Sequence, residues 1–241
     1  MQRFFVGRDA YRDNTVTIVG EDARHISFSL RMKKGETISV CLPDATLLTC
    51  VLESFGDDAV TARVVSEALC DTEPPYKARL YQALPKGDKL ETIVQKAVEC
   101  GVYEIIPFES SRCIAKWDRS PEKKLERLNR IALEAAKQCG RGYVPRVKSP
   151  LTFKQVVEEA ADADRALFCY EAGGEDLGRI LLDGGDTIAV IIGAEGGFSP
   201  EEAALAQDKG LTVCSLGKRI LRCETASGFV LAALSCIREL S

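Results

Sequence analysis

The sequence predicts an α/β protein built from a small β domain and a larger α/β domain. Three observations predict this class. Residues 1–72 contain short β-prone runs separated by Asp, Gly and Pro, whereas residues 76–241 alternate β-prone runs with amphipathic helical patterns. Between them lies the polar, Pro-containing stretch 71–75, which suits a linker. We therefore expect an antiparallel domain followed by a mostly parallel sheet covered by helices.

The first domain is expected to be a small antiparallel barrel. Its β-prone runs are residues 16–19, 37–42, 47–52 and 60–65. A basic stretch that contains Arg31 separates the first two runs and is expected to be a turn. Such a turn either touches a phosphate backbone or forms a solvated hairpin corner. His25 is expected to make structural hydrogen bonds rather than to act in catalysis.

In the second domain, strands and helices are expected to alternate. The expected strands are residues 80–84, 104–108, 165–170, 188–192 and 211–216. Apolar residues at helical spacing predict helices over residues 88–100 and over a longer stretch that opens at Ser120-Pro121. Gly101 and Gly140 end these two helices, as glycines commonly do. Five strands with intervening helices predict a parallel sheet that is covered on both faces.

A glycine-rich loop, Gly193–Phe198, follows the fourth of these strands. Ser199 and Pro200 suit the first positions of a helix, and Glu202 completes a capping box with Ser199. Three glycines within five residues allow a backbone to approach a ligand closely. The order strand, glycine loop, helix predicts a ligand at the carboxyl end of the sheet.

The charge of this loop narrows the class of ligand. Carboxylates at Glu195 and residues 201–202 stand where a phosphate requires hydrogen-bond donors and positive potential. Neither GxGxxG nor a Gly-Lys-Ser/Thr sequence is present, which argues against a dinucleotide or a nucleoside triphosphate. A nucleoside-like cation without a phosphate fits better, and S-adenosylmethionine (AdoMet) is such a ligand.

Composition is typical of a soluble globular protein in a reducing compartment. Of the 241 residues, 46% are hydrophobic and 28% are charged. The sequence contains no signal-peptide core and no long apolar segment, so we expect a cytoplasmic protein without a membrane partner. The ten cysteines form no C-x-x-C pair and are expected to be reduced and mostly buried. With a single histidine, the sequence argues against bound metal and against Ser-His-Asp chemistry.

The net charge of −4 conceals an uneven distribution. Residues 1–75 carry a net charge of −4, residues 76–150 carry +7, and residues 151–241 carry −7. A basic middle third in an acidic protein suggests an anionic partner, of which nucleic acid is the common one. The alternative is a solvated, charged helix face.

The last predicted helix, residues 224–240, is apolar over most of its circumference. A helix of this kind is covered on two sides. One side is expected to pack on the sheet. A second subunit is expected to cover the other, and burial inside the monomer is the alternative.

Two motifs together resemble the RsmE-type 16S rRNA (uracil-N3) methyltransferases of the SPOUT class. They are Gly193-Ala-Glu-Gly-Gly-Phe-Ser and Leu216-Gly-Lys-Arg-Ile-Leu-Arg-Cys-Glu-Thr-Ala226. The resemblance extends to Lys86-Gly-Asp88, Ser111-Arg112, Glu134-Ala-Ala-Lys-Gln-Cys-Gly-Arg141 and Arg3-Phe-Phe5. It covers nearly the whole chain. Ala194 stands where the family usually has Pro, and Cys100 where it has Leu, and neither change removes a functional group.

The resemblance implies a PUA-like, RNA-binding barrel and a methyltransferase domain with a five- or six-stranded sheet and a trefoil knot. It implies a homodimer that methylates N3 of one uridine of 16S rRNA (uridine 1498 in the usual rRNA numbering) on the small ribosomal subunit. The cofactor-binding residues that it implies are Phe168, Glu171, Gly193, Glu195, Gly196, Gly197, Leu216, Gly217, Ile220, Leu221 and Thr225. The implied RNA-binding residues are Arg3, Arg31, Lys86, Arg112, Gln138 and Arg141.

The chemistry of the reaction suggests two catalytic residues. N3 of uracil becomes nucleophilic only when its proton leaves, and the resulting negative charge spreads to both carbonyl oxygens. Arg222 is the candidate that stabilises this charge. Glu224 is the candidate that accepts the proton or orients Arg222, and a salt bridge between the two that holds the knot is the alternative. For Gln138 and Arg141 the alternative to RNA contact is helix capping.

Two other functions remain open at this stage. A SPOUT enzyme can also methylate a ribose 2′-hydroxyl. The chain can also be an RNA-binding assembly factor with a vestigial pocket. Mapping the modified nucleotide tests the first, and a methyl-transfer assay tests the second.

Overall fold

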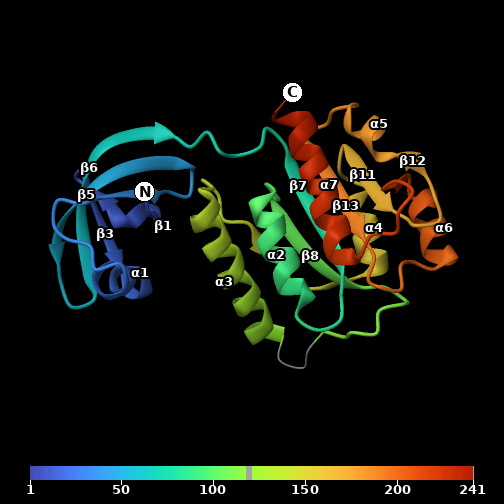
Figure 1. Ribbon diagram of the computed structural model, residues 1–241, viewed down its shortest axis with the longest axis horizontal. Coiled ribbons are helices and arrows are strands. Elements are labelled where there is room, and N and C mark those ends of the chain that lie inside the picture. The colour runs from blue at the N-terminus through green and yellow to red at the C-terminus, as the bar shows by residue number, and fades with distance from the viewer. Residues whose placement is uncertain (118–120, 241) are drawn as a thin grey trace. The chain divides into compact units, whose positions relative to one another are not determined.

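The computed structural model describes residues 1–117 and 121–240, which form two compact units (Figure 1). The first unit consists of Met1–Glu73 and Ala136–Val144, and the second of Pro74–Ala135 and the chain from Pro145 onward. The expected boundary at residues 72–76 lies close to this division. The sequence gives no sign that residues 136–144 belong to the first unit. Ser120, expected to open a helix, lies outside the described residues.

The first unit is a six-stranded mixed sheet with three short helical segments. Its elements are β1 (Arg3–Phe5), the 3-10 turn η1 (Arg8–Ala10), β2 (Tyr11–Arg12), β3 (Thr15–Val19), α1 (Gly20–Arg24), the π-helical turn η2 (His25–Ser29), β4 (Thr37–Cys41), β5 (Thr46–Phe55) and β6 (Ala59–Leu69). The strand order is β1-β4-β5-β6-β3-β2. β1 pairs with β4 in parallel and the other pairs are antiparallel. The four predicted runs correspond to β3–β6, and the sequence reading missed β1 and β2.

A helical segment that the sequence reading did not assign precedes the expected basic turn after β3. The chain runs through α1 directly into η2, up to Ser29. Ala23 and Ile26, three residues apart, are both buried in the core of the sheet. This helical spacing places two apolar side chains on one face, and the basic stretch that contains Arg31 then follows as a turn. Arg31, in the turn that follows, is exposed and has a φ of 52°.

The second unit contains a parallel sheet with helices on both faces. Its elements are β7 (Lys77–Ala83), α2 (Lys89–Glu99), β8 (Glu104–Glu109), α3 (Pro121–Cys139), β9 (Arg146–Val147), β10 (Leu151–Thr152), α4 (Phe153–Ala160), β11 (Arg165–Cys169), β12 (Glu175–Asp176), α5 (Leu177–Leu181), β13 (Thr187–Ile192), α6 (Pro200–Asp208), β14 (Thr212–Ser215) and α7 (Cys223–Arg238). The strand order is β10-β8-β7-β13-β11-β14-β12, with β9 beside β8. Every pairing among the described strands of this sheet is parallel.

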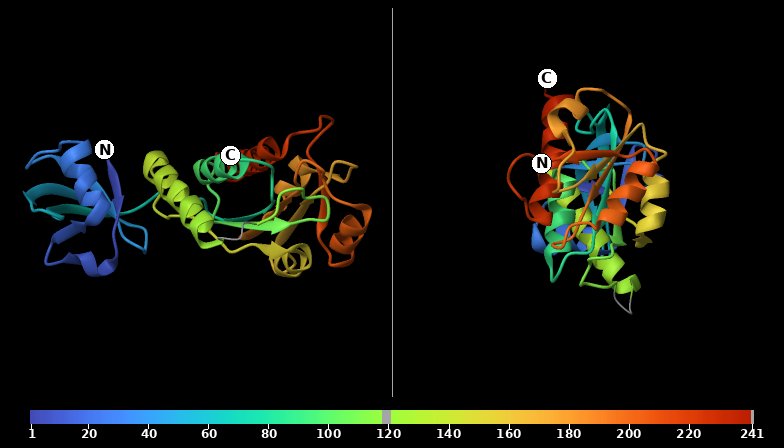
Figure 2. Two further views of the ribbon diagram at one scale, coloured as in Figure 1. Left: turned by 90° about the horizontal axis from the view of Figure 1, so that it is seen from below. Right: turned by 90° about the vertical axis from the view of Figure 1, so that its right-hand side faces the viewer.

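The helices of the second unit form two layers. α2 and α7 pack together on one face of the sheet, and α4 and α6 pack together on the other (Figure 2). This arrangement confirms the expected α/β class. The sequence reading missed α4, although Thr152 and Gln155 form a capping box at its start. Its apolar residues Phe153, Val156, Val157 and Ala160 are buried, and a helix of eight residues gave too short a pattern to be noticed.

All ten cysteines lie in the described part of the chain and are thiols rather than disulfides, and six of them are buried. Among the described residues, no helix combines the length and the apolar character that a membrane span requires.

Candidate cofactor and RNA-binding site

A hollow lies at the carboxyl ends of three neighbouring parallel strands, β11, β13 and β14. The last residue of each strand lines it, namely Cys169, Ile192 and Ser215. The hollow spans about 660 Å³, a volume that includes the part open to solvent. The predicted position of the ligand, at the carboxyl end of the sheet, agrees with this geometry.

Side chains are disfavoured at two glycines of the loop that forms one wall. Gly197 has a φ of 61°, in the left-handed region that side chains with a Cβ rarely adopt. A Cβ at Gly197 would also collide with the carboxylate of Glu171, which lines the hollow as well. A Cβ at Gly193 would lie 3.1 Å from Cε2 of Phe198 and 3.3 Å from the Gly197 backbone. The loop therefore presents bare backbone to the hollow.

The loop is held from outside the hollow by residues of other segments. Nε2 of the buried Gln82 donates to the Gly193 carbonyl at 3.4 Å, and Nη1 of Arg112 donates to the Gly196 carbonyl at 3.2 Å. The Glu195 carboxylate accepts from the backbone N–H of Lys86 at 3.2 Å and from Nζ of Lys89 at 2.8 Å. Glu195 is thus directed to α2, and it is not among the described residues that line the hollow.

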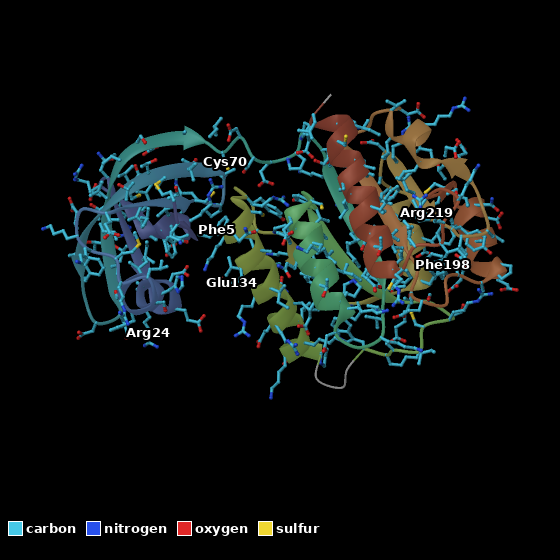
Figure 3. All side chains as sticks on the ribbon, viewed as in Figure 1. Phe5, Arg24, Cys70, Glu134, Phe198 and Arg219 are labelled. Atoms are coloured by element: carbon cyan, nitrogen blue, oxygen red, sulfur yellow. The ribbon has the colours of Figure 1, made fainter. Side chains whose placement is uncertain are left out.

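An aromatic cluster packs against Phe198, the last residue of the glycine loop. The ring of Phe198 lies 4.3 Å from that of Phe168 and is stacked on that of Phe108 at 6.3 Å, measured between ring centroids. Phe153 of α4 contacts all three rings. Phe168, which the resemblance implied in cofactor binding, is fully buried in this cluster and does not line the hollow. Figure 3 labels Phe198 beside the carboxyl-terminal elements of the second unit.

The second wall of the hollow is the segment between β14 and α7. Gly217 has a φ of 100°, and Ser215 Oγ accepts from its N–H at 3.3 Å. Lys218 and Arg219 follow it on the wall, and Figure 3 labels Arg219. Ile220 lines the hollow on one side, yet 88% of its surface is exposed. The segment ends at Cys223, the first residue of α7, whose pKa burial raises to about 12.

Arg222 and Glu224 flank the first residue of α7. Arg222 is the N-cap of the helix, and its carbonyl accepts from the N–H groups of Thr225 and Ala226. Its side chain is exposed. Among the described residues, the ion-pair partner of Glu224 is Lys89 at 3.5 Å and not Arg222. This contact disfavours both the Arg222–Glu224 salt bridge and an orienting role of Glu224 toward Arg222.

The structure brings together seven of the eleven residues implied in cofactor binding. The hollow is lined by Glu171, Gly193, Gly197, Leu216, Gly217, Ile220 and Leu221. Phe168, Glu195, Gly196 and Thr225 are not among its described lining residues. Nine further residues, not singled out from the sequence, also line it: Cys169, Tyr170, Ile192, Ala194, Ser215, Lys218, Arg219, Cys223 and Ala226. Five of them lie within the two motifs, Ile192 and Ser215 directly precede them, and Cys169 and Tyr170 lie at the end of β11.

The residues implied in RNA binding differ in what they contact. Lys86, Arg112 and Gln138 have exposed side chains. Arg3 is half-buried and donates to the carbonyls of Gly140 and Arg141 within the first unit. It therefore supports the segment 136–144 of that unit. An RNA contact of any of these residues stays a prediction.

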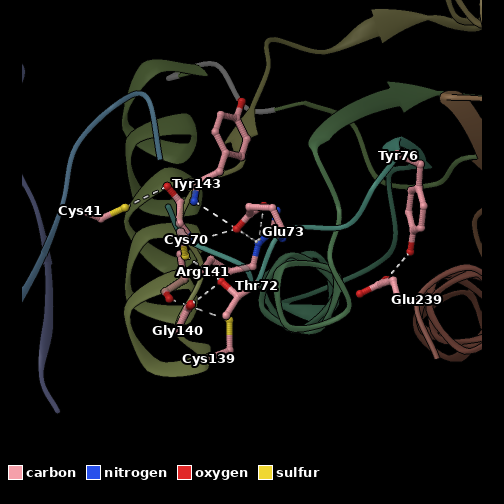
Figure 4. Close-up of polar contacts among 12 residues, drawn as sticks. Cys41, Cys70, Thr72, Glu73, Tyr76, Cys139, Gly140, Arg141, Tyr143 and Glu239 are labelled. Atoms are coloured by element: carbon pink, nitrogen blue, oxygen red, sulfur yellow. Dashed lines mark hydrogen bonds and ion pairs between the residues drawn. The ribbon is translucent and has the colours of Figure 1, made fainter. Parts of the chain in front are cut away.

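Arg141 is engaged inside the first unit. Its side chain is 5% exposed, and its guanidinium donates to Glu73 through Nη2 at 2.6 Å and through Nε at 2.9 Å. The same carboxylate accepts from the N–H groups of Gly142 at 2.8 Å and Tyr143 at 3.2 Å (Figure 4). This geometry favours an anchoring role for Arg141, because a paired, buried guanidinium is shielded from a phosphate.

Arg141→Ala is expected to destabilise the first unit. The change leaves the Glu73 carboxylate without its cation, and breaking a buried ion pair in this way typically costs about 3–5 kcal/mol. Urea unfolding measures the effect, with Arg130→Ala, an exposed arginine of α3, as the control. Unchanged stability combined with a shallower salt dependence of RNA binding would instead assign Arg141 to RNA contact.

The fold and the hollow define a class of protein. A parallel sheet covered on both faces, with a glycine-walled ligand site at its carboxyl edge, is the architecture of an α/β enzyme domain, and the family model described as an RNA methyltransferase domain matches residues 72–235. Most of the second unit lies within this match.

The chain belongs to the family of ribosomal RNA small subunit methyltransferase E. A relative of that name from Bacillus subtilis is 35% identical over 252 residues, covering 100% of this chain and 98% of the relative. Another from Mesomycoplasma hyopneumoniae is 33% identical over 239 residues, covering 99% and 100%. The crystal structure of the Neisseria gonorrhoeae protein of this name, bound to S-adenosyl methionine, superimposes with a TM-score of 0.88 at 28% identity and 98% coverage of both chains.

Proposed function

We propose that this protein transfers the methyl group of AdoMet to N3 of one uridine of 16S rRNA, uridine 1498 in the usual rRNA numbering. The proposed substrate is the assembled small ribosomal subunit. The observation that carries the proposal is the hollow with glycine-bearing walls at the carboxyl ends of β11, β13 and β14. Family membership supports it, because the relatives are named for methylation of small-subunit rRNA.

AdoMet fits the residues that line this hollow. Gly197 and the segment from Leu216 to Leu221 line the two walls, and loop backbone of this kind can pair with an adenine edge. Glu171 supplies a carboxylate for a cationic ligand. When bound, AdoMet supplies an electrophilic methyl group on a positively charged sulfur.

The chain's own residues would act on the uracil. Arg222, exposed at the start of α7, would stabilise the negative charge that develops on the uracil oxygens as N3 loses its proton. Glu224 is the candidate acceptor of that proton. Backbone hydrogen bonding at the start of α7 lowers its pKa, with a further contribution from Lys89, so the group is ionised at neutral pH. A carboxylate of low pKa is a weak base, so the catalytic role of Glu224 has less support than that of Arg222.

A homodimer is part of the proposal. The buried stripe of α7 includes Val230 and Leu234, while Thr225, Phe229, Ala232 and Cys236 form a second, exposed stripe at helical spacing. We propose that a second copy covers this stripe and the exposed Ile220. The closed barrel of the first unit and the trefoil knot of the segment after Leu216 are proposed on the same family resemblance.

Phe229→Glu is expected to convert a dimer into a monomer. Phe229 is 43% exposed on α7, and a carboxylate there would be desolvated in an interface without a partner. Light scattering coupled to gel filtration measures the mass. Phe55→Glu is the matched control, since Phe55 is 38% exposed in the first unit and should tolerate the charge. A monomeric unmodified protein would contradict the dimer.

Incubation with labelled AdoMet and unmodified small subunits, followed by mass mapping of the RNA, tests the function. The expected result is one methyl group that stays on the uracil base when the base is separated from its ribose. A methyl group on a ribose would assign the alternative 2′-O specificity. Binding to the subunit without methyl transfer would leave a non-catalytic assembly factor.

A further inference from the structure

Lys89 lies between two carboxylates that belong to two distant segments. It is the first residue of α2, and its Nζ is 2.8 Å from Oε1 of Glu195 and 3.5 Å from Oε2 of Glu224. Glu195 belongs to the glycine loop and Glu224 to the first turn of α7, so one ammonium group connects three segments. The side chains are 30%, 31% and 24% exposed for Lys89, Glu195 and Glu224, respectively.

The two carboxylates need a cation between them. The two carboxylates repel one another, and without the ammonium group between them this repulsion would not be offset. Burial raises the pKa of Glu195, but the hydrogen bond from Lys89, backbone hydrogen bonds and the charge of Lys89 together outweigh this effect, so its pKa lies below the ordinary value. The hydrogen bond to Glu195 raises the pKa of Lys89. All three groups are therefore charged at neutral pH.

These contacts lie directly behind the two walls of the hollow. Gly193 and Gly197, on either side of Glu195, line one wall, and Cys223, next to Glu224, lines the other. Arg222 is the N-cap of the same helix turn. Holding Glu195 and Glu224 on one ammonium therefore fixes the distance between the glycine loop and the start of α7.

We propose that Lys89 is a positioning residue that holds the glycine loop against the first turn of α7, and through that turn sets the place of Arg222. Lys89 does not line the hollow among its described residues, so it acts through Glu195 and Glu224 rather than on the ligand. The inference rests on the proposed function in one respect only, namely that the hollow binds AdoMet.

Lys89→Met tests the proposal, because methionine keeps the unbranched side chain, one atom shorter than that of lysine, and removes the charge. Amide hydrogen exchange of residues 193–197 and 222–226, measured on the protein without cofactor, is expected to accelerate about 10-fold in both segments together. AdoMet affinity by calorimetry and kcat are each expected to fall about 10-fold. Lys89→Arg is expected to restore most of each value, since it keeps the cation.

Lys96→Met is the matched control. Lys96 lies on the same helix and pairs with Glu99 at 2.8 Å, an ion pair within α2 that leaves the hollow untouched. Its loss is expected to leave hydrogen exchange of both segments unchanged. Unchanged exchange in Lys89→Met, or equal effects of the two methionine variants, would overturn the positioning role. If the unmodified protein binds no AdoMet, the proposed function fails, whereas the exchange experiment still decides whether Lys89 couples the two segments.

Discussion

Arg222→Ala is expected to lower kcat about 10²–10³-fold while AdoMet affinity stays within a few-fold. Arg222 is exposed at the start of α7 and is not among the described residues that line the hollow. Its loss should therefore leave the cofactor in place and remove the charge that stabilises the uracil anion. Single-turnover methylation of small subunits measures the rate, and calorimetry measures the AdoMet dissociation constant.

Arg219→Ala is the informative comparison for this prediction. Arg219 belongs to the same segment, between β14 and α7, but it lines the hollow. We expect its loss to change AdoMet affinity more than kcat. If both variants lose kcat equally, the net charge of the segment matters rather than the position of Arg222. If Arg222→Ala loses affinity and kcat to the same extent, Arg222 belongs to cofactor binding or to folding.

Much of the site follows from local sequence chemistry. The capping box of Ser199 and Glu202 fixes the start of α6, and the apolar run before it can only be a buried strand. These two elements determine where the glycine loop must lie. The five predicted strands of the second unit correspond to β7, β8, β11, β13 and β14. For these elements, the local pattern and the structure agree because residues close in sequence determine where each strand or helix forms.

Which side chains at the end of a strand reach the hollow depends on the strand's register, and the sequence does not determine this register. Successive residues of a strand point to opposite faces, so a shift of one position exchanges a core residue for a site residue. At the end of β11, Phe168 faces the aromatic cluster while Cys169 lines the hollow. The family motif places this strand end at the cofactor but does not decide which of the two side chains reaches it.

Contacts between distant residues were beyond sequence reasoning altogether. Glu195 appeared as a carboxylate for a cationic ligand, yet its cation is Lys89, 106 positions earlier. Arg141 was implied in RNA binding, with helix capping as the alternative, yet its guanidinium pairs with Glu73, 68 positions earlier. In both cases the residue type correctly predicted an opposite charge nearby. Whether that charge belongs to a ligand or to the chain is decided by tertiary structure.

Several acidic residues around the hollow likewise pair with groups of the chain and not with a ligand. Glu202 caps α6, and its carboxylate also accepts from the N–H and the hydroxyl of Ser111 at 2.7 and 2.9 Å. Glu195 is paired with Lys89. Of the acidic residues near the glycine loop, Glu171 is the one that lines the hollow. Glu171 is thus the carboxylate that the described lining offers to a cationic cofactor, and Lys218 and Arg219 line the same hollow.

Gly197→Val is expected to weaken AdoMet binding about 10- to 100-fold. At a φ of 61°, a β-branched residue costs about 1–3 kcal/mol of backbone strain, and the new side chain would also collide with Glu171. The loop relieves both by moving, which changes the wall that the cofactor contacts.

Gly184→Val separates this effect from backbone strain alone. Gly184 has a φ of 80° and open space around it, in the turn between α5 and β13, so valine should lower stability by a similar amount without altering the hollow. Calorimetric titration with AdoMet and thermal unfolding of both variants give the two quantities. Equal affinities of Gly197→Val and the unmodified protein would remove the glycine loop from the binding site. Equal losses of affinity in both variants would show that general destabilisation, and not the shape of this wall, controls binding.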